Sequence, residues 1–203
     1  PDLMRGEELQ LLGWMRVAGL KQPTAQLVVL PGTHNKWVLV KGGKIETFVT
    51  ALTGELYSLL QNNSVLIANP ESADFSADIF LQGVTVATTL ESGQLLQALF
   101  ATRSRQVLGE LSESHASSYL SGLLIGSDVV GSLALMEKLM EKQMDGIASV
   151  DLIGDSALSR CYQLALESVG IKAELRDATQ IAISGYLAVY EALSPQLSRD
   201  IVL

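Results

Sequence analysis

The feature that most constrains the fold is the alternation of strand and helix patterns in the last third of the chain. The patterns are, in order, a strand at 147–153, a turn at Gly154-Asp155-Ser156, a helix at 157–169, a strand at 171–175 and a helix at 178–193. Strands joined by a helix pair in parallel, and the helices then cover the sheet. This part of the chain therefore predicts an α/β fold. Asp177 is placed to cap the last helix, and Pro195 to stop it.

Three short apolar runs near the N-terminus predict adjacent antiparallel strands. They lie at 26–30, 36–40 and 45–50, and the last two are separated by a turn that contains Gly42 and Gly43. Glycine pairs between apolar runs are a strong hairpin signal. Joined to the parallel unit, these strands predict a mixed sheet. The spacing of apolar residues adds helices at 7–18, 53–61, 72–82, 91–111 and 127–144.

Composition narrows the range of partners and locations. The 22 acidic and 14 basic residues give a net charge of −8, which disfavours nucleic acid and anionic lipid as partners. The apolar segment Tyr119–Met136 carries Asp128 at its middle, so we interpret it as buried core rather than as a membrane span. The single cysteine, Cys161, excludes an internal disulfide and fits a reducing, cytoplasmic location. We expect it to be a small core residue rather than a nucleophile.

The turn between the first two strands, Pro31-Gly32-Thr33-His34, is a candidate site for a phosphate group. A glycine permits close approach to the backbone. The Thr33 hydroxyl and exposed amides suit phosphate oxygens, and Lys36 adds a positive charge. An ordinary hairpin turn with a surface lysine explains the same residues.

A second candidate is Gly154-Asp155-Ser156, where a strand runs into a helix. The amides at a helix start favour anions, and a glycine lets a nucleotide come close. The turn holds one glycine and not the G-x-G-x-x-G fingerprint. A plain turn with Asp155 as the helix cap is the alternative.

A third candidate is the charged segment that precedes the predicted helix 7–18. Arg5 suits an anionic substrate, and Asp2 is able to accept a proton from a substrate hydroxyl. The alternative is a solvated first turn in which Glu7 and Glu8 complement the helix dipole.

Several motifs of other enzyme classes are absent from the sequence. It contains neither the G-x-x-x-x-G-K-[ST] phosphate loop nor the G-x-S-x-G nucleophile turn. His34 and His115 are far apart in sequence and lack the spacing of a zinc site. We therefore predict no metal-ligating residues in this chain.

Taken in order, the segments PDLMRGEE, LPGTHNKW, TALTGEL, SGLLIG and LIGDSALSRCYQLAL resemble the 2-keto-3-deoxygalactonate kinases over essentially the whole chain. The resemblance implies the actin-like ATPase fold, which is ribonuclease H-like, with two α/β domains that close over ATP. It also implies transfer of the ATP γ-phosphate, with Mg²⁺, to the C6 hydroxyl of 2-keto-3-deoxygalactonate in galactonate catabolism.

The same resemblance implies roles for particular residues. The implied catalytic base is Asp2. The implied sugar-acid contacts are Arg5, Glu7 and Glu55. The implied ATP contacts are Gly32, Thr33, His34 and Lys36 at the phosphates and Gly154, Asp155 and Ser156 at the nucleoside.

One motif that the resemblance calls for is missing. The first phosphate loop of the fold, Asp-x-Gly-Thr, should precede these segments, and the sequence does not contain it. We therefore expect a C-terminal portion of a kinase, inactive alone, with most of the first domain missing. In this division 1–25 is a remnant of the sugar-acid-binding domain, 26–177 is the nucleotide-binding domain, and 178–203 is a connecting helix and tail.

An exposed former interface would favour homo-oligomers. Two alternatives remain open. One is a non-catalytic nucleotide- or sugar-acid-binding module of the same fold. The other is a structural domain that binds no ligand.

Overall fold

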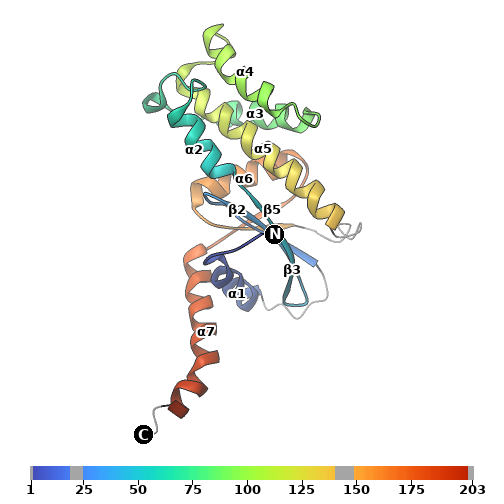
Figure 1. Ribbon diagram of the computed structural model, residues 1–203, viewed down its shortest axis with the longest axis vertical. Coiled ribbons are helices and arrows are strands. Elements are labelled where there is room, and N and C mark those ends of the chain that lie inside the picture. Colours follow the sequence, from blue (N-terminus) through green and yellow to red (C-terminus); the bar gives the residue numbers. More distant parts are fainter. Residues whose placement is uncertain (1, 19–24, 140–148, 201–203) are drawn as a thin grey trace.

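The computed structural model describes residues 2–18, 25–139 and 149–200, and within them one sheet lies between two sets of helices (Figure 1). The elements are, in order, α1 (Glu7–Ala18), β1 (Ala25–Leu30), β2 (Asn35–Lys41), β3 (Lys44–Ala51), α2 (Thr53–Asn63), the 3₁₀ helix η1 (Pro70–Ser72), α3 (Ala77–Thr89), α4 (Leu95–Val107), α5 (Glu113–Leu139), β4 (Val150–Ile153), α6 (Ser156–Ser168), β5 (Ala173–Arg176) and α7 (Ala178–Asp200).

The strand order β3-β2-β1-β4-β5 confirms the predicted mixed sheet. β1, β2 and β3 are antiparallel neighbours, whereas β4 runs parallel to β1 and β5 parallel to β4. The turn between β2 and β3 is tight because Gly42 and Gly43 have φ values of 56° and 73°, which suit the twist of a hairpin. The carboxyl ends of β1 and β4 consequently meet at one edge of the sheet.

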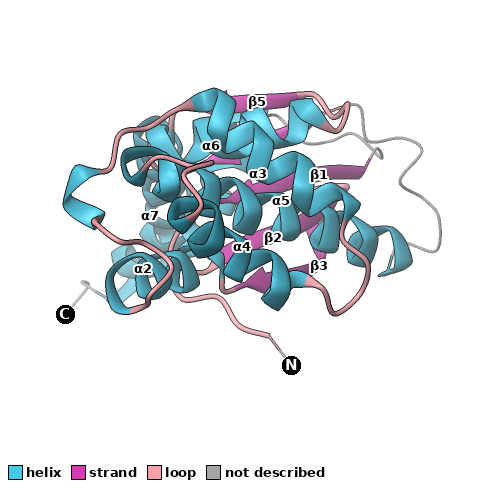
Figure 2. Ribbon diagram, turned by 90° about the horizontal axis from the view of Figure 1, so that it is seen from above, coloured by secondary structure: helices cyan, strands magenta, loops and turns pink. Residues whose placement is uncertain are grey.

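Alternate residues of each inner strand serve two different cores. Leu27 and Val29 of β1 pack with residues of α3, α5 and α6, whereas Val28 and Leu30 pack with residues of α1 and α7. Figure 1 places α1 and α7 on the opposite side of the sheet from α2–α5, and Figure 2 looks through α3, α4 and α5 onto the strands. Burial on both faces explains why β1 is a continuous apolar run.

α5 differs from its sequence prediction. The helix expected to begin at 127 begins at Glu113, while the predicted end at 140–144 lies outside the described residues. Glycines in the part of α5 that was not predicted allow close helix packing. A Cβ at Gly122 would overlap the Phe80 carbonyl group of α3, at 2.8 Å from its carbon. The predicted start of this helix was wrong because the packing partner of these glycines is distant in sequence.

The same helix contains the segment that was weighed as a membrane span. α5 is the one described helix long and apolar enough to cross a membrane, and 61% of its apolar window is buried inside the protein. The core helix of a folded domain passes the same test of length and composition. Burial in this structure supports the interpretation of Tyr119–Met136 as core.

The caps explain most of the helix boundaries. Asp155 accepts hydrogen bonds from the first amides of α6, and Asp177 does the same for α7, as predicted. α3 begins at Ala77, later than predicted, because Ser76 is its cap. α4 is shorter than predicted, and positive-φ glycines stand just outside each of its ends. The expected stop at Pro195 was wrong, because α7 continues to Asp200.

α1 is tied to the sheet by a buried hydrogen bond. The Trp14 indole Nε1 donates to the Asp151 carboxylate on β4 over 2.6 Å, and Arg176 of β5 donates to the other carboxylate oxygen over 2.9 Å. Trp14→Phe keeps an aromatic ring in the core but leaves the buried Asp151 short of a donor. We expect the free energy of unfolding to fall by about 2 kcal/mol, measured by urea denaturation of this chain.

The matched control for that measurement is Val17→Ala. Val17 lies on the same helix and is 56% exposed, so its loss should change the free energy of unfolding by less than about 0.5 kcal/mol. Equal stabilities of Trp14→Phe and the control would mean that the Trp14–Asp151 hydrogen bond contributes nothing.

Candidate functional site

Two hydrogen bonds hold the loop between β1 and β2 in place. The Gly32 amide donates to the Asn35 side-chain oxygen over 2.7 Å, and the Thr33 carbonyl accepts from the Glu55 amide in the first turn of α2 over 2.9 Å. Gly54 of the same turn has no side chain, and a Cβ there would overlap the Gly32 carbonyl oxygen and lie 2.9 Å from the Thr33 Cα. The loop therefore rests directly on the N-terminus of α2.

The turn after β4 lies beside this loop. β4 and β1 are parallel neighbours, so both turns leave the sheet at the same edge, which is where ligands bind in open α/β sheets. A Cβ at Gly154 would be 2.8 Å from the Pro31 carbonyl oxygen, so glycine is needed for the two turns to meet. The Asp155 carboxylate accepts from the Ala157 and Leu158 amides over 3.0 and 3.1 Å, and is thus the cap of α6.

A cleft of about 610 Å³ joins the two turns. Its lining comes from the β1–β2 loop, the β4–α6 turn and the starts of α1 and α7. The predicted site residues that the structure brings together in this lining are Glu7, Gly32, Thr33, His34, Gly154 and Asp155. Segments more than 100 residues apart in sequence thus form one surface.

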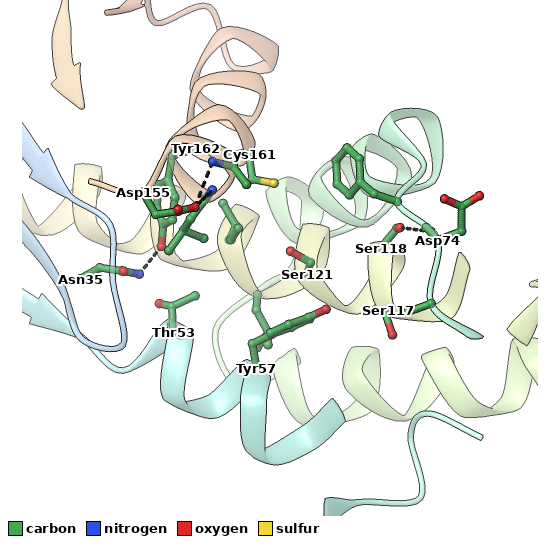
Figure 3. A pocket seen from close by; sticks show the side chains of 17 residues that line it. Asn35, Thr53, Tyr57, Asp74, Ser117, Ser118, Ser121, Asp155, Cys161 and Tyr162 are labelled. Atoms are coloured by element: carbon green, nitrogen blue, oxygen red, sulfur yellow. Dashed lines mark hydrogen bonds between the residues drawn. The ribbon is translucent and has the colours of Figure 1, made fainter. Parts of the chain in front are cut away.

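An apolar pocket of about 380 Å³ adjoins this cleft and shares Asp155 with it. Figure 3 shows it between α2, α5 and α6, with Tyr57 on one wall and Cys161 on the other. Burial raises the pKa of the Tyr57 hydroxyl and of the Cys161 thiol above their ordinary values, so both groups are neutral at pH 7. A protonated, partly buried thiol agrees with the predicted core role of Cys161.

No motif in the sequence pointed to this pocket. Its walls are apolar helix faces. In the sequence, such faces cannot be distinguished from helix faces that pack in the core. A row of hydroxyls on α5, at Ser117, Ser118 and Ser121, also lines it. The serines in an otherwise apolar helix were the one available signal.

The Asp2 carboxylate lies beside β3, next to Thr50. It accepts hydrogen bonds from the Thr50 amide over 2.7 Å, from the Thr50 hydroxyl over 2.6 Å and from the Leu3 amide over 2.8 Å. Partial burial opposes ionisation of Asp2, but the Thr50 and Leu3 hydrogen bonds and the charge of Lys36 outweigh it and lower the pKa. Asp2 is therefore an ionised carboxylate at neutral pH, and its orientation is set by these hydrogen bonds.

Lys36 belongs to the Asp2 group and not to the lining of the cleft. Its buried ammonium donates to the Thr50 hydroxyl over 2.9 Å and lies 3.9 Å from a Glu7 carboxylate oxygen. Lys36 and Thr50 are direct partners in the β2–β3 ladder. Thr50 was missed in the sequence analysis, because a register shift between Leu39 and Val40 brings Thr50, and not Val49, opposite Lys36.

The remaining predicted residues lie around these groups. His34 and Glu55 form an exposed pair, 2.6 Å apart, at the mouth of the loop. The Arg5 amide donates to Glu7 over 2.7 Å, which places Arg5 at the entrance of α1. Ser156 faces a neighbouring recess with Arg176. Glu7 lines the cleft and also approaches Lys36, so it links the cleft to the Asp2 group.

Residues 2–18, 25–139 and 149–200 contain no candidate metal centre. In these ranges no three histidine, cysteine or acidic side chains come together in a group that could hold an ion.

The mixed sheet, with turns at the carboxyl ends of β1 and β4 that line one cleft, has an actin-like ATPase fold. Component A of (R)-2-hydroxyglutaryl-CoA dehydratase from Acidaminococcus fermentans shares this fold, with a TM-score of 0.56 at 14% identity over 94% of this chain and 70% of that chain. Residues 1–189 match the 2-keto-3-deoxy-galactonokinase family, and the chain belongs to that family.

Relatives of the family agree with this placement. The chain is 36% identical to the probable 2-dehydro-3-deoxygalactonokinase DgoK1 of Rhizobium meliloti and 37% identical to the 2-dehydro-3-deoxygalactonokinase of Escherichia coli, over 96% and 89% of its length. A crystal structure described as a 2-dehydro-3-deoxygalactonokinase protein from Sinorhizobium meliloti superposes with a TM-score of 0.83 at 34% identity, over 96% of this chain and 62% of that one.

The chain spans 61% of the length of the Rhizobium meliloti relative and 55% of the Escherichia coli one. The activity of a whole kinase is consequently a proposal for this chain, and so are its substrates.

Proposed function

We propose that the protein to which this chain belongs transfers the γ-phosphate of ATP to the C6 hydroxyl of 2-keto-3-deoxygalactonate, as part of galactonate catabolism. The observation that carries the proposal is the cleft in which the Gly32–Thr33 loop and the Gly154–Asp155 turn meet, next to an apolar pocket. This arrangement offers phosphate contacts at one end and a dry pocket for a base at the other.

In this proposal the nucleotide lies along the shared wall of the two cavities. The phosphates approach the Gly32–Thr33 backbone, and the Thr33 hydroxyl donates to a phosphate oxygen. The ribose passes the Gly154–Asp155 turn, and the base enters the pocket against Tyr57. Because the loop already rests on α2, little ordering entropy is lost when the phosphates bind.

The sugar acid is assigned to the Asp2 side of the molecule. As the substrate hydroxyl attacks the γ-phosphorus, its proton passes to the Asp2 carboxylate, and the bond between the γ-phosphorus and the bridging oxygen breaks to release ADP. Arg5 would bind the substrate carboxylate, while Glu7 and Glu55 would accept hydrogen bonds from other hydroxyls. Mg²⁺ on the nucleotide would supply charge neutralisation.

The structure changes the proposed role of Lys36. Its ammonium holds the Thr50 hydroxyl, which in turn donates to Asp2. We assign Lys36 to the orientation of Asp2 rather than to the ATP phosphates. His34 and Ser156 are retained as contacts at the edges of the nucleotide site.

Three further expectations stay proposals. One is the division of the chain into 1–25, 26–177 and 178–203. In this division α1 belongs to the first part and α7 to the third, and both pack on one face of the sheet. A cytoplasmic location and a homo-oligomer are the others.

Ligand-dependent stabilisation tests the proposal against its alternatives. A ligand that binds the folded chain raises its melting temperature, and the rise grows with the ratio of ligand concentration to Kd. We expect ATP to stabilise this chain and the sugar acid to accelerate ADP formation in the full-length form, meaning the gene product that contains this sequence. Stabilisation without any turnover of the full-length form would instead indicate a sensing module. No stabilisation by either ligand would indicate a structural domain.

Thr33→Val tests the phosphate contact. The substitution keeps the shape of the side chain and removes the hydroxyl. A hydrogen bond to a charged group is worth a few kcal/mol, so we expect the KM for ATP in the full-length form to rise about tenfold. Steady-state kinetics with varied ATP measures this. Thr47→Val, at a half-buried position of β3, is the matched control. Unchanged KM and kcat in Thr33→Val would reject the phosphate role.

A further inference from the structure

Asp128 is a buried carboxylate that the proposed chemistry does not use. It lies on α5, is 8% exposed, and accepts five hydrogen bonds from uncharged donors. The donors are Asn35 Nδ2 at 2.9 Å, Trp37 Nε1 at 3.0 Å, Thr53 Oγ1 at 2.9 Å, Ser132 Oγ at 2.8 Å and Tyr162 Oη at 2.5 Å. Within the described residues, none of the salt bridges involves it.

A buried carboxylate without a cation costs free energy of folding. Its presence is explained if its hydrogen bonds orient groups that an apolar residue could not orient. Burying a charge without a cation is expensive, and well-packed apolar residues often replace buried charges without loss of stability. The distinguishing property of Asp128 is therefore the set of groups that it orients. Three of its donors lead to the edges of the nucleotide cleft.

The first connection runs through Asn35. The Asn35 amide nitrogen donates to Asp128, which turns its amide oxygen toward the Gly32 amide, at 2.7 Å. The acceptors on the nitrogen side are Asp128 and the Tyr162 hydroxyl, and together they fix which end of the Asn35 amide faces the loop. Asp128 thereby sets the position of the Gly32 amide.

The second connection runs through the start of α2. Thr53 is the first residue of α2 and donates its hydroxyl to Asp128. Two residues on, the Glu55 amide donates to the Thr33 carbonyl. The loop is thus held from both ends by groups that converge on one carboxylate.

The third connection reaches α6, in the wall of the apolar pocket that adjoins the cleft. The Tyr162 hydroxyl of α6 donates to Asp128 and accepts from Asn35, and Figure 3 shows Tyr162 directed toward Asn35. Burial, together with the neighbouring Asp128 charge, raises the pKa of Tyr162 well above its ordinary value, so the hydroxyl keeps its proton and remains a donor. α6 begins at the Gly154–Asp155 turn, so this bond ties the second turn to the first.

We propose that Asp128 is a positioning residue that fixes the Gly32–Thr33 loop relative to the Gly154–Asp155 turn before the nucleotide binds. The inference rests on the proposed function for its meaning, but the loop geometry can be measured without any ligand. It predicts that loss of the carboxylate loosens the loop and weakens ATP binding, while leaving the fold in place.

Asp128→Asn is the test variant. It keeps the shape of the side chain, but its new NH2 group would face a donor in either orientation, Asn35 Nδ2 at one position or Trp37 Nε1 at the other. Hydrogen–deuterium exchange of the nucleotide-free chain should show the Gly32 and Glu55 amides exchanging about tenfold faster. The Kd for ATP, measured by calorimetry on the same chain, should rise about tenfold.

Two controls separate positioning from general destabilisation. Val129→Ala removes buried methyl groups from the same turn of α5 without touching the loop contacts. It should lower the melting temperature and leave loop exchange and the Kd for ATP unchanged. The paired swap Asp128→Asn with Asn35→Asp should restore protection of the Gly32 amide, because the amide at position 128 then donates to the carboxylate at position 35.

The outcomes separate this inference from the proposed function. Faster loop exchange in Asp128→Asn, with rescue by the swap, supports positioning even where neither variant nor wild type binds ATP, a result that would remove only the proposed function. Exchange and Kd that follow the melting temperature alone, as in Val129→Ala, would overturn the inference. If Asp128→Asn does not fold, a folded swap variant without Gly32 protection would also overturn it.

Discussion

Asp2→Asn is expected to lower kcat of the full-length form by about 100-fold or more, because the amide cannot accept the substrate proton. The native carboxylate is already ionised and is held by the Thr50 amide and hydroxyl. An amide at this position can still accept the Thr50 amide hydrogen bond, so the N-terminal segment should keep its place. The loss should therefore fall on kcat and leave the KM for both substrates nearly unchanged.

The measurement is steady-state kinetics of the two forms beside Glu8→Gln as a control. Glu8 is a neighbouring acidic residue of α1 that accepts a hydrogen bond from the Gly6 amide. The pH profile adds a second readout. The pKa of Asp2 lies below its ordinary value of 3.8, so protonation of the base should limit kcat/KM only below pH 3.8. Wild-type turnover by Asp2→Asn would remove Asp2 as the base.

Gly54→Ala is the second substitution with a large expected effect. Its Cβ would overlap the Gly32 carbonyl oxygen, and that atom belongs to a backbone that cannot rotate away as a side chain would. α2 is held through Thr53 and Asp128, so the loop has to move instead. A displacement of about 1 Å at a substrate-positioning loop is expected to lower kcat/KM for ATP about 100-fold.

Gly131→Ala is the matched control for this prediction. Gly131 lies on α5 with nothing within 4 Å of the position of a Cβ. Alanine is favoured over glycine in a helix, so this variant should be at least as stable as wild type and equally active. Kinetics of Gly54→Ala that match those of Gly131→Ala would show that the loop does not depend on its contact with α2.

Local patterns in the sequence carried most of the fold. The glycine pair of the β2–β3 turn predicts the hairpin, because few other residues adopt positive φ, and the strand–turn–helix order at the C-terminus predicts parallel pairing. The predictions failed where a distant partner decides the outcome. The helix expected to begin at 127 begins at Glu113, and its Gly122 packs against the carbonyl group of Phe80, a residue of another helix.

In the candidate site, too, residues in local motifs were predicted and contacts between distant residues were not. The residues of the two turns stand in short motifs, so the sequence placed both loops that line the cleft. Asp128 was noticed only as a charge in an apolar segment. Its partners Asn35 and Trp37 are 93 and 91 residues away, and no local pattern predicts such contacts. The direction of Lys36 depends on which face of β2 meets α1, which periodicity alone does not determine.

The central claim is phosphoryl transfer from ATP to a sugar acid, and phosphorus NMR of one reaction mixture tests it most directly. The mixture holds the full-length form, ATP, Mg²⁺ and 2-keto-3-deoxygalactonate. We predict a phosphomonoester signal that grows in step with ADP and depends on the sugar acid. An unchanged ATP spectrum, or inorganic phosphate that forms without the phosphomonoester, would contradict the assignment of this protein as a sugar-acid kinase.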